Sequence, residues 1–372
     1  MQINHPQAHP ILGPWQKKQA AMLYHYSSVE YLTPLYRLIS SFINNFADPT
    51  LDAAKIQGRD ALVTDEKWGD RNTSNNWSNN AWPFLKELQT SLARDIATRQ
   101  SGEYSITKVN ECLRGIAEYS TEWATQQERQ LFREGLAAIS LYSLPHDKTV
   151  FEYHNRWDDA TFAHYFPIFL LKNPAIPKFK VRLDITATTG EVPPETGAYI
   201  AHGDPHATLQ FVWKEGRGAK LRKANTFNEI GLAALKQVGR DDLWLSDEKM
   251  FKFAMQEKYS DKFRATLTYA GSEWPSAASA TVAAEAFSSV PRKWSLVERI
   301  PDETEMLEDL SPSEYREEIP FRVEGGAVCV KSGYYFTPSA NRGPQYFCRD
   351  DIFPKLQSDY GESYWQWERS QK

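Results

Sequence analysis

The chain has 372 residues, 41% of them hydrophobic, and its 12 Trp, 18 Tyr and 19 Phe can build a substantial core. This composition excludes a globally disordered protein. The formal net charge of −5 removes the broad positive field that non-specific binding of nucleic acid needs. We therefore expect a folded protein, long enough for two ordinary domains, with no nucleic acid among its partners.

The sequence carries no sign of export or of membrane insertion. Residues 1–19 lack the apolar stretch of a signal peptide, and the densest apolar run, residues 162–171, is shorter than the ~18 residues of a membrane span. No pair of cysteines has the CxxC spacing of a zinc knuckle. The cysteines are Cys112, Cys329 and Cys348. We expect a cytoplasmic protein with free thiols and no membrane partner.

Residues 1–147 are predicted to form a helical domain. Apolar residues recur there at helical spacing, in helices separated by short polar links. Thr125 followed by Glu128 is a capping box that starts the last of these helices. The polar insert at residues 65–80 is predicted to be an exposed loop. Antiparallel helices with short links form a bundle.

Residues 148–372 are predicted to form an α+β domain. Short β-branched and aromatic runs, divided by Gly and Pro, indicate an antiparallel sheet. Residues 179–188 alternate apolar and polar side chains, so one face of that strand is expected to be buried. Capping patterns predict inserted helices near residues 226–239 and 246–259, and a run of small residues predicts another near residues 276–287. The predicted fold class is α+β, with an N-terminal helical bundle followed by an antiparallel sheet domain with inserted helices.

One pattern occurs twice in the second half: GEVPPETGAY at residues 190–199 and GAVCVKSGYY at residues 326–335. The matched pairs are Gly190 with Gly326, Val192 with Val328, Thr196 with Ser332, Gly197 with Gly333, and Tyr199 with Tyr335. Each copy is predicted to be a hairpin module, over about residues 188–213 and 324–348. Glycines at such bends permit a positive φ or a close backbone approach.

Candidate catalytic groups are few. HGDPH at residues 202–206 places two imidazoles beside a carboxylate, which are groups that a transition metal binds. Gly, Asp and Pro also favour a turn for backbone reasons alone, and no spacing supplies a third ligand. The common nucleophile, nucleotide and zincin motifs are missing from the sequence. We predict no catalytic residue, no metal and no cofactor.

Acidic residues are concentrated between Glu298 and Glu324. Ten Asp and Glu against three Arg give this segment a charge of −7. Because the whole chain has a charge of −5, the rest of the chain carries +2. A solvated linker would show this pattern, and so would a surface that captures a basic partner. The candidate partner-contact residues are Asp302, Glu303, Glu305, Glu308 and Asp309.

From about Pro177 to the C-terminus, the chain resembles immunity protein families 71 and 72 of bacterial polymorphic-toxin and type VI secretion systems. The resemblance rests on the two copies together with PHATLQFVW, NTFNEIGLAALKQVGRDDLWL and DYGESYWQW. It implies a cytoplasmic protein, not an enzyme, that binds and neutralises one cognate effector toxin, usually encoded beside it. The alternative is an enzyme that reverses toxin damage, for example a hydrolase of a modified target.

Overall fold

The structure is a computed structural model in which the chain forms two compact units, Met1–Leu307 and Glu308–Lys372. It describes residues 10, 12–151, 156–215, 219–269, 272–306, 323–329, 333–337, 345–348, 351–355 and 364–367. The fold is α+β, as predicted. The predicted domain boundary at residues 147/148 lies inside a continuous helix, α7 (Gln126–Val150), and the division between the units comes at residues 307/308.

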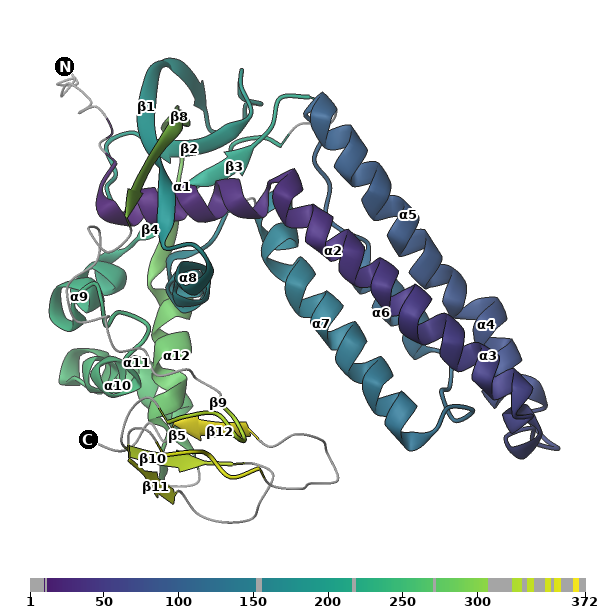
Figure 1. The fold of residues 1–372 in the computed structure, drawn as a ribbon. Coiled ribbons are helices and arrows are strands. Elements are labelled where there is room, and N and C mark those ends of the chain that lie inside the picture. Colours follow the sequence, from purple (N-terminus) through teal and green to yellow (C-terminus); the bar gives the residue numbers. More distant parts are fainter. Residues whose placement is uncertain are drawn as a thin grey trace, which may run out of the picture. The chain divides into compact units, whose positions relative to one another are not determined.

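A helical bundle forms one part of the first unit (Figure 1). Its helices are α2 (Val29–Phe42), α3 (Asp48–Ile56), α4 (Ser74–Asn80), α5 (Trp82–Thr98), α6 (Val109–Ala117) and α7. Shorter turns join them: η1 (Ile43–Ala47), η2 (Arg59–Leu62), η3 (Asp70–Asn72) and η4 (Arg99–Ser101). Apolar side chains at helical spacing meet in a common core that includes Ile39, Leu85 and Phe132.

Two local predictions for this bundle have different outcomes. The capping box is confirmed, because Thr125 N donates to Glu128 Oε2 at 2.8 Å and Glu128 N donates to Thr125 Oγ1 at 3.3 Å. The loop predicted over residues 65–80 is wrong in its second half, where α4 forms. Trp77 of α4 is fully buried, so the core holds this Asn-rich segment in a helix that its polarity does not suggest.

The first unit also contains an antiparallel four-stranded sheet in the order β1-β8-β2-β3. Its strands are β1 (Ala175–Thr188), β2 (Gly197–Ala201), β3 (Gln210–Val212) and β8 (Lys293–Met306). The predicted alternation in β1 fails at Leu183, which is 45% exposed. A register shift between Arg182 and Thr186 is the reason, because the residues of a bulge lose the two-residue period of the pleat.

Helix α1 (Pro14–Tyr26), which the sequence analysis did not predict, runs along this sheet (Figure 1). Further helices lie between β1 and α7 or between β3 and β8, and the predicted inserted helices are among them. They are α8 (Asp159–Lys172), α9 (Glu229–Val238), α10 (Asp247–Ala254), α11 (Glu257–Leu267), η5 (Pro275–Ala277) and α12 (Ala278–Glu285). Two small strand pairs accompany them: β4 (Ala224–Phe227) with β7 (Phe287–Val290), and β5 (Thr268–Tyr269) with β6 (Ser272–Glu273).

The second unit contains another antiparallel four-stranded sheet, in the order β9-β12-β10-β11. Its strands are β9 (Val323–Glu324), β10 (Gly333–Phe336), β11 (Gln345–Phe347) and β12 (Tyr364–Trp367). Its core contains the buried rings of Tyr335, Phe347, Phe353 and Trp365. Phe347 lies 4.9 Å from Trp365 and 4.8 Å from Phe353 between ring centroids, so these aromatic contacts form a small core of their own.

Candidate functional site

The two sheets are copies of one another, which confirms the predicted duplication and extends it beyond a hairpin. Tyr199 lies opposite Gln210 in the first sheet, and Tyr335 lies opposite Gln345 in the second. The third strand of each copy, β8 or β12, pairs with the far side of the tyrosine strand. The fourth, β1 or β9, pairs with that third strand. Order, direction and register are therefore the same in both sheets.

The bend before each hairpin is also the same. Gly190 has φ +96° and Gly326 has φ +93°, a region that only glycine adopts without strain. Gly190 N donates to Leu221 O at 2.7 Å, and Leu221 N donates back to the carbonyl of the residue after the glycine at 2.9 Å. Likewise, Gly326 N donates to Phe353 O at 2.6 Å, and Phe353 N donates to the carbonyl of Ala327, the residue after the glycine, at 3.0 Å. The repeated glycine thus has a backbone role.

A buried tryptophan occupies the same position in each third strand. Trp294 lies opposite Ala187, which is three residues before Gly190. Trp365 lies opposite Val323, which is three residues before Gly326. Both indoles are at most 1% exposed. The sequence did not reveal this equivalence, because the third strands follow insertions of unequal length. The signal was present in the shared Trp of WSLV and WQW.

The two copies differ on one face. In the first sheet Phe211 is 1% exposed, with its ring 6.0 Å from that of Tyr24 of α1 and 5.2 Å from that of Tyr104. The equivalent residue of the second sheet, Tyr346, is 56% exposed, and its ring packs against Tyr334 at 5.1 Å. Helix α1 covers a face in the first copy that is aromatic and solvent-exposed in the second.

The predicted partner-contact residues lie partly on β8. Asp302, Glu303 and Glu305 are at its far end, while Glu308 and Asp309 lie outside the described residues. Glu303 pairs with Lys178 at 3.1 Å, and Glu305 pairs with Lys17 at 2.8 Å. The acidic strand is therefore partly neutralised by cations of the same unit. Only tertiary structure could reveal this, since Lys17 is distant in the sequence.

The side chains of the HGDPH turn make structural contacts. The two imidazoles contact different neighbours. His202 Nε2 lies 2.7 Å from Ser295 Oγ, and the His206 ring packs against Phe227 at 5.7 Å. Asp204 Oδ2 pairs with Arg292 at 3.0 Å. Among the described residues, His, Cys, Asp and Glu side chains nowhere gather in threes that could hold a metal ion.

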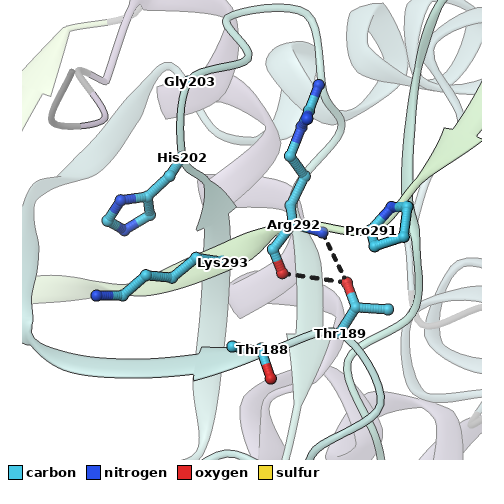
Figure 2. Close-up of a pocket in the computed structure, with 7 residues that line it drawn as sticks. All are labelled: Thr188, Thr189, His202, Gly203, Pro291, Arg292 and Lys293. Carbon is cyan, nitrogen blue, oxygen red and sulfur yellow. Dashed lines mark hydrogen bonds between the residues drawn. The ribbon is translucent and has the colours of Figure 1, made fainter. Parts of the chain in front are cut away.

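A cavity of about 440 Å³ opens where β1 ends and β8 begins (Figure 2). Its lining residues are Thr188, Thr189, His202, Gly203, Pro291, Arg292 and Lys293. The lining offers the Lys293 ammonium, an imidazole and hydroxyl groups, while the Arg292 guanidinium is already paired with Asp204. Such a surface suits a small anion, a carboxylate or a phosphate, more than a cation.

The groups in this cavity do not form a nucleophile and base. Thr189 Oγ1 accepts from Arg292 N at 3.0 Å and lies 3.2 Å from Arg292 O, which ties the cavity wall together (Figure 2). Ser295, the partner of His202, is fully buried within β8, so its hydroxyl cannot reach a substrate. The cavity can bind by charge, but its described side chains supply no general base beside an accessible nucleophile.

The most elaborate buried polar cluster is structural. Asp159 is 1% exposed and accepts hydrogen bonds from Trp15 at 2.9 Å and Trp244 at 2.7 Å, and it also pairs with Arg240. Burial raises the pKa of this carboxyl, while Arg240 opposes the shift. The cluster joins α1 and α8 to the link between α9 and α10. Because both carboxylate oxygens already accept hydrogen bonds, the cluster is not open to a ligand.

A further surface feature is the turn at residues 65–71, which was predicted only as part of a loop. Its Trp68 is 57% exposed, whereas Trp77, from the same polar insert, is fully buried. Ile56 and Leu62, shortly before it in the chain, are 86% and 87% exposed. Trp is among the residue types enriched in protein interfaces, and its signal in the sequence was the Trp in DEKWGDR.

No protein-family model, no curated protein and no solved structure matches this chain. The resemblance to immunity protein families 71 and 72 therefore rests on its motifs. Separately, none of the helices in the described part of the chain combines the length and the apolar character of a membrane span.

Proposed function

We propose that this chain is an immunity protein, which binds and neutralises a cognate effector toxin of a type VI secretion or related polymorphic-toxin system and so protects the producing cell and its kin. One observation carries the proposal. Of the motifs behind the resemblance to immunity protein families 71 and 72, the two copies, PHATLQFVW and DYGESYWQW contribute strands to two sheets with the same strand order and register. The remaining motif, at residues 225–245, forms β4, α9 and the link to α10.

A neutralising protein acts by occupying a surface, so it needs a rigid scaffold and exposed contact groups but no catalytic constellation. The scaffold here is the packed first unit, and exposed apolar and charged groups such as Trp68 and Asp302 lie on it. We expect a stoichiometric complex in the cytoplasm that buries at least about 1,200 Å² and blocks the active site of the toxin or access to it. Neither nucleic acid nor a membrane is among the proposed partners.

The direct test is co-expression with the product of the adjacent gene, the expected toxin. Relief of its toxicity and co-purification in a 1:1 complex are the expected results. If the chain neither relieves the toxicity nor co-purifies, it is not an immunity protein for that product. Size-exclusion chromatography with multi-angle light scattering gives the stoichiometry.

The acidic segment is a proposed part of the contact. Reversing Asp302, Glu303, Glu305, Glu308 and Asp309 together to lysine is expected to slow association with a basic toxin and to flatten its salt dependence. Because Glu303 and Glu305 already pair with lysines, reversing Asp302, Glu308 and Asp309 alone is the sharper variant. An unchanged association rate at low salt would exclude this segment from the contact.

The alternative is an enzyme that reverses toxin damage, for example a hydrolase of a modified target. The cationic cavity beside Lys293 favours it, because a phosphate-bearing modification would fit such a lining. The amount of protein needed decides between the two. A binder protects at about one copy per toxin, whereas an enzyme protects when it is far scarcer, so titrated expression against a constant toxin level distinguishes them.

A further inference from the structure

The turn that carries Trp68 is held by backbone hydrogen bonds. Asp65 N donates to Gly69 O at 3.2 Å, and Gly69 N donates to Asp65 O at 2.7 Å. The Asp65 carboxylate accepts from Lys67 N at 2.7 Å and from Trp68 N at 2.9 Å, both at Oδ1. Gly69 has φ +57°, which lets the chain close this turn. The position of the tryptophan is therefore set before any partner binds.

The indole itself packs on charged side chains and not on the core. Lys67 Nζ lies 4.8 Å and the Arg71 guanidinium carbon 5.8 Å from the Trp68 ring. These cations order the ring while more than half of it stays in contact with water. Most of this indole is therefore available for contact with a partner.

A tryptophan presented in this way is suited to anchor a protein interface. Trp and Arg are enriched among the few residues that carry most of the binding energy. A ring already ordered by its turn loses little conformational entropy on binding. Ile56 and Leu62, exposed in the adjoining segment, provide further apolar contact area.

We propose that Trp68 is the anchor by which this protein holds its toxin, inserting into an apolar pocket whose rim carries carboxylates. The acidic rim follows from charge: insertion removes water from Lys67 and Arg71, and such cations need an opposite charge when desolvated. The carboxylates of the turn do not supply it. Asp65 Oδ1 is engaged with the amides of the turn, and within the described residues Glu66 and Asp70 form no ion pair with Lys67 or Arg71. This inference rests on the proposed function and names the contact residue.

The surrounding charges predict how the contact responds to salt. Glu66 and Asp70 lie on the same turn, so residues 65–71 are mixed in charge and exert little long-range attraction. Loss of Trp68 should therefore raise the dissociation rate and leave the association rate nearly unchanged. Contact through the acidic segment would have the opposite signature, with an effect on association that depends on salt.

The experiment compares Trp68→Ala with Trp274→Ala, a matched control whose indole is 54% exposed elsewhere on the same unit. Binding to the purified product of the adjacent gene, made harmless by an active-site substitution, is measured by surface plasmon resonance. Trp68→Ala is expected to weaken the complex at least about 30-fold, through dissociation, and Trp274→Ala less than about 3-fold. Thermal unfolding should be the same for both variants and the parent.

The outcomes separate the inference from the proposed function. If the parent binds and Trp68→Ala binds equally well, the anchor is wrong and the immunity function stands. If the parent does not bind, both fail. A single-stranded oligonucleotide is the third probe, because Trp with two cations also suits base stacking. Oligonucleotide binding that is lost with Trp68→Ala, without an effect on the toxin, would overturn the anchor in favour of nucleic acid.

Discussion

The two four-stranded sheets share their pairing but not their surroundings. Both have the same strand order, the same bend glycine and the same buried tryptophan. In the first copy the described residues between β3 and β8 include the helices α9, α10, α11, η5 and α12, and α1 covers one face; in the second copy β11 and β12 are joined by residues 348–363. The repeat therefore specifies backbone pairing, while the cover on the faces comes from segments outside it.

The largest effect should come from the two tryptophans that the copies share. Trp294→Ala and Trp365→Ala are each expected to cost about 3 to 5 kcal/mol, since each removes a fully buried ring from the centre of its sheet. Hydrogen exchange followed by mass spectrometry should show lost protection confined to the unit that carries the substitution. Similar loss in both units from one substitution would contradict two separate cores.

The difference between the exposed faces predicts unequal effects at equivalent positions. Phe211→Ala should destabilise the first unit by about 3 kcal/mol, because Tyr24 and Tyr104 would be left around a cavity. Tyr346→Ala should change stability by less than about 0.5 kcal/mol, because its ring is 56% exposed. Chemical denaturation of the full chain measures both. Equal costs would mean that the second face is as well covered as the first.

Acid should act differently on the two units, because every histidine of the chain precedes residue 308. Burial lowers the pKa of His146 to about 4. The unfolded state, with an ordinary pKa near 6.5, binds the proton first, so this contribution is complete above about pH 6.5 and is lost as the pH falls towards 4. The loss should be about 1 to 3 kcal/mol.

The measurement for this prediction is the unfolding free energy of the parent and of His146→Gln at several pH values. Burial raises the pKa of the neighbouring Asp147 to about 7, which gives a slope of the opposite sign over about pH 4 to 7. Comparing the two proteins at each pH removes that contribution, since both contain Asp147. A pH-independent difference would show that His146 does not titrate in this range.

Smaller effects than those of Trp294→Ala, Trp365→Ala and Phe211→Ala should come from the bend glycines, and they should be nearly equal. Gly190→Ala and Gly326→Ala are each expected to cost about 1 to 2 kcal/mol through their positive φ. A Cβ at Gly190 meets no atom within 4 Å, and at Gly326 it meets only the flexible end of Lys355. Thermal unfolding resolves the two units if they melt separately.

Gly197 is the control for this pair, because its backbone has an ordinary strand conformation. A Cβ there would lie 2.6 Å from Tyr24 Oη and 2.7 Å from Leu296 Cδ1, so close approach and not φ requires the glycine. Tyr24→Phe should therefore partly rescue Gly197→Ala and should not rescue Gly190→Ala. Equal rescue of both would show that the two glycines do not have separate roles.

Local patterns in the sequence were enough to predict several features. The α+β class, the capping box of Thr125 and Glu128, the inserted helices and the repeated glycines depend on residues within a few positions of one another. Such features are set by backbone preference and side-chain periodicity. The same reasoning placed the exposed polar turn at residues 65–71, although not the role proposed for Trp68.

Tertiary structure alone decided the features that join distant residues. The cover of α1 on the first sheet, the equivalence of Trp294 and Trp365, and the pairing of Glu305 with Lys17 link segments more than 60 residues apart. The sequence could not show whether a given tryptophan is buried or exposed, because burial also depends on contacts with distant residues. Trp68 and Trp77 lie in one polar stretch of sequence, and only packing against the bundle core buries the second and leaves the first in water.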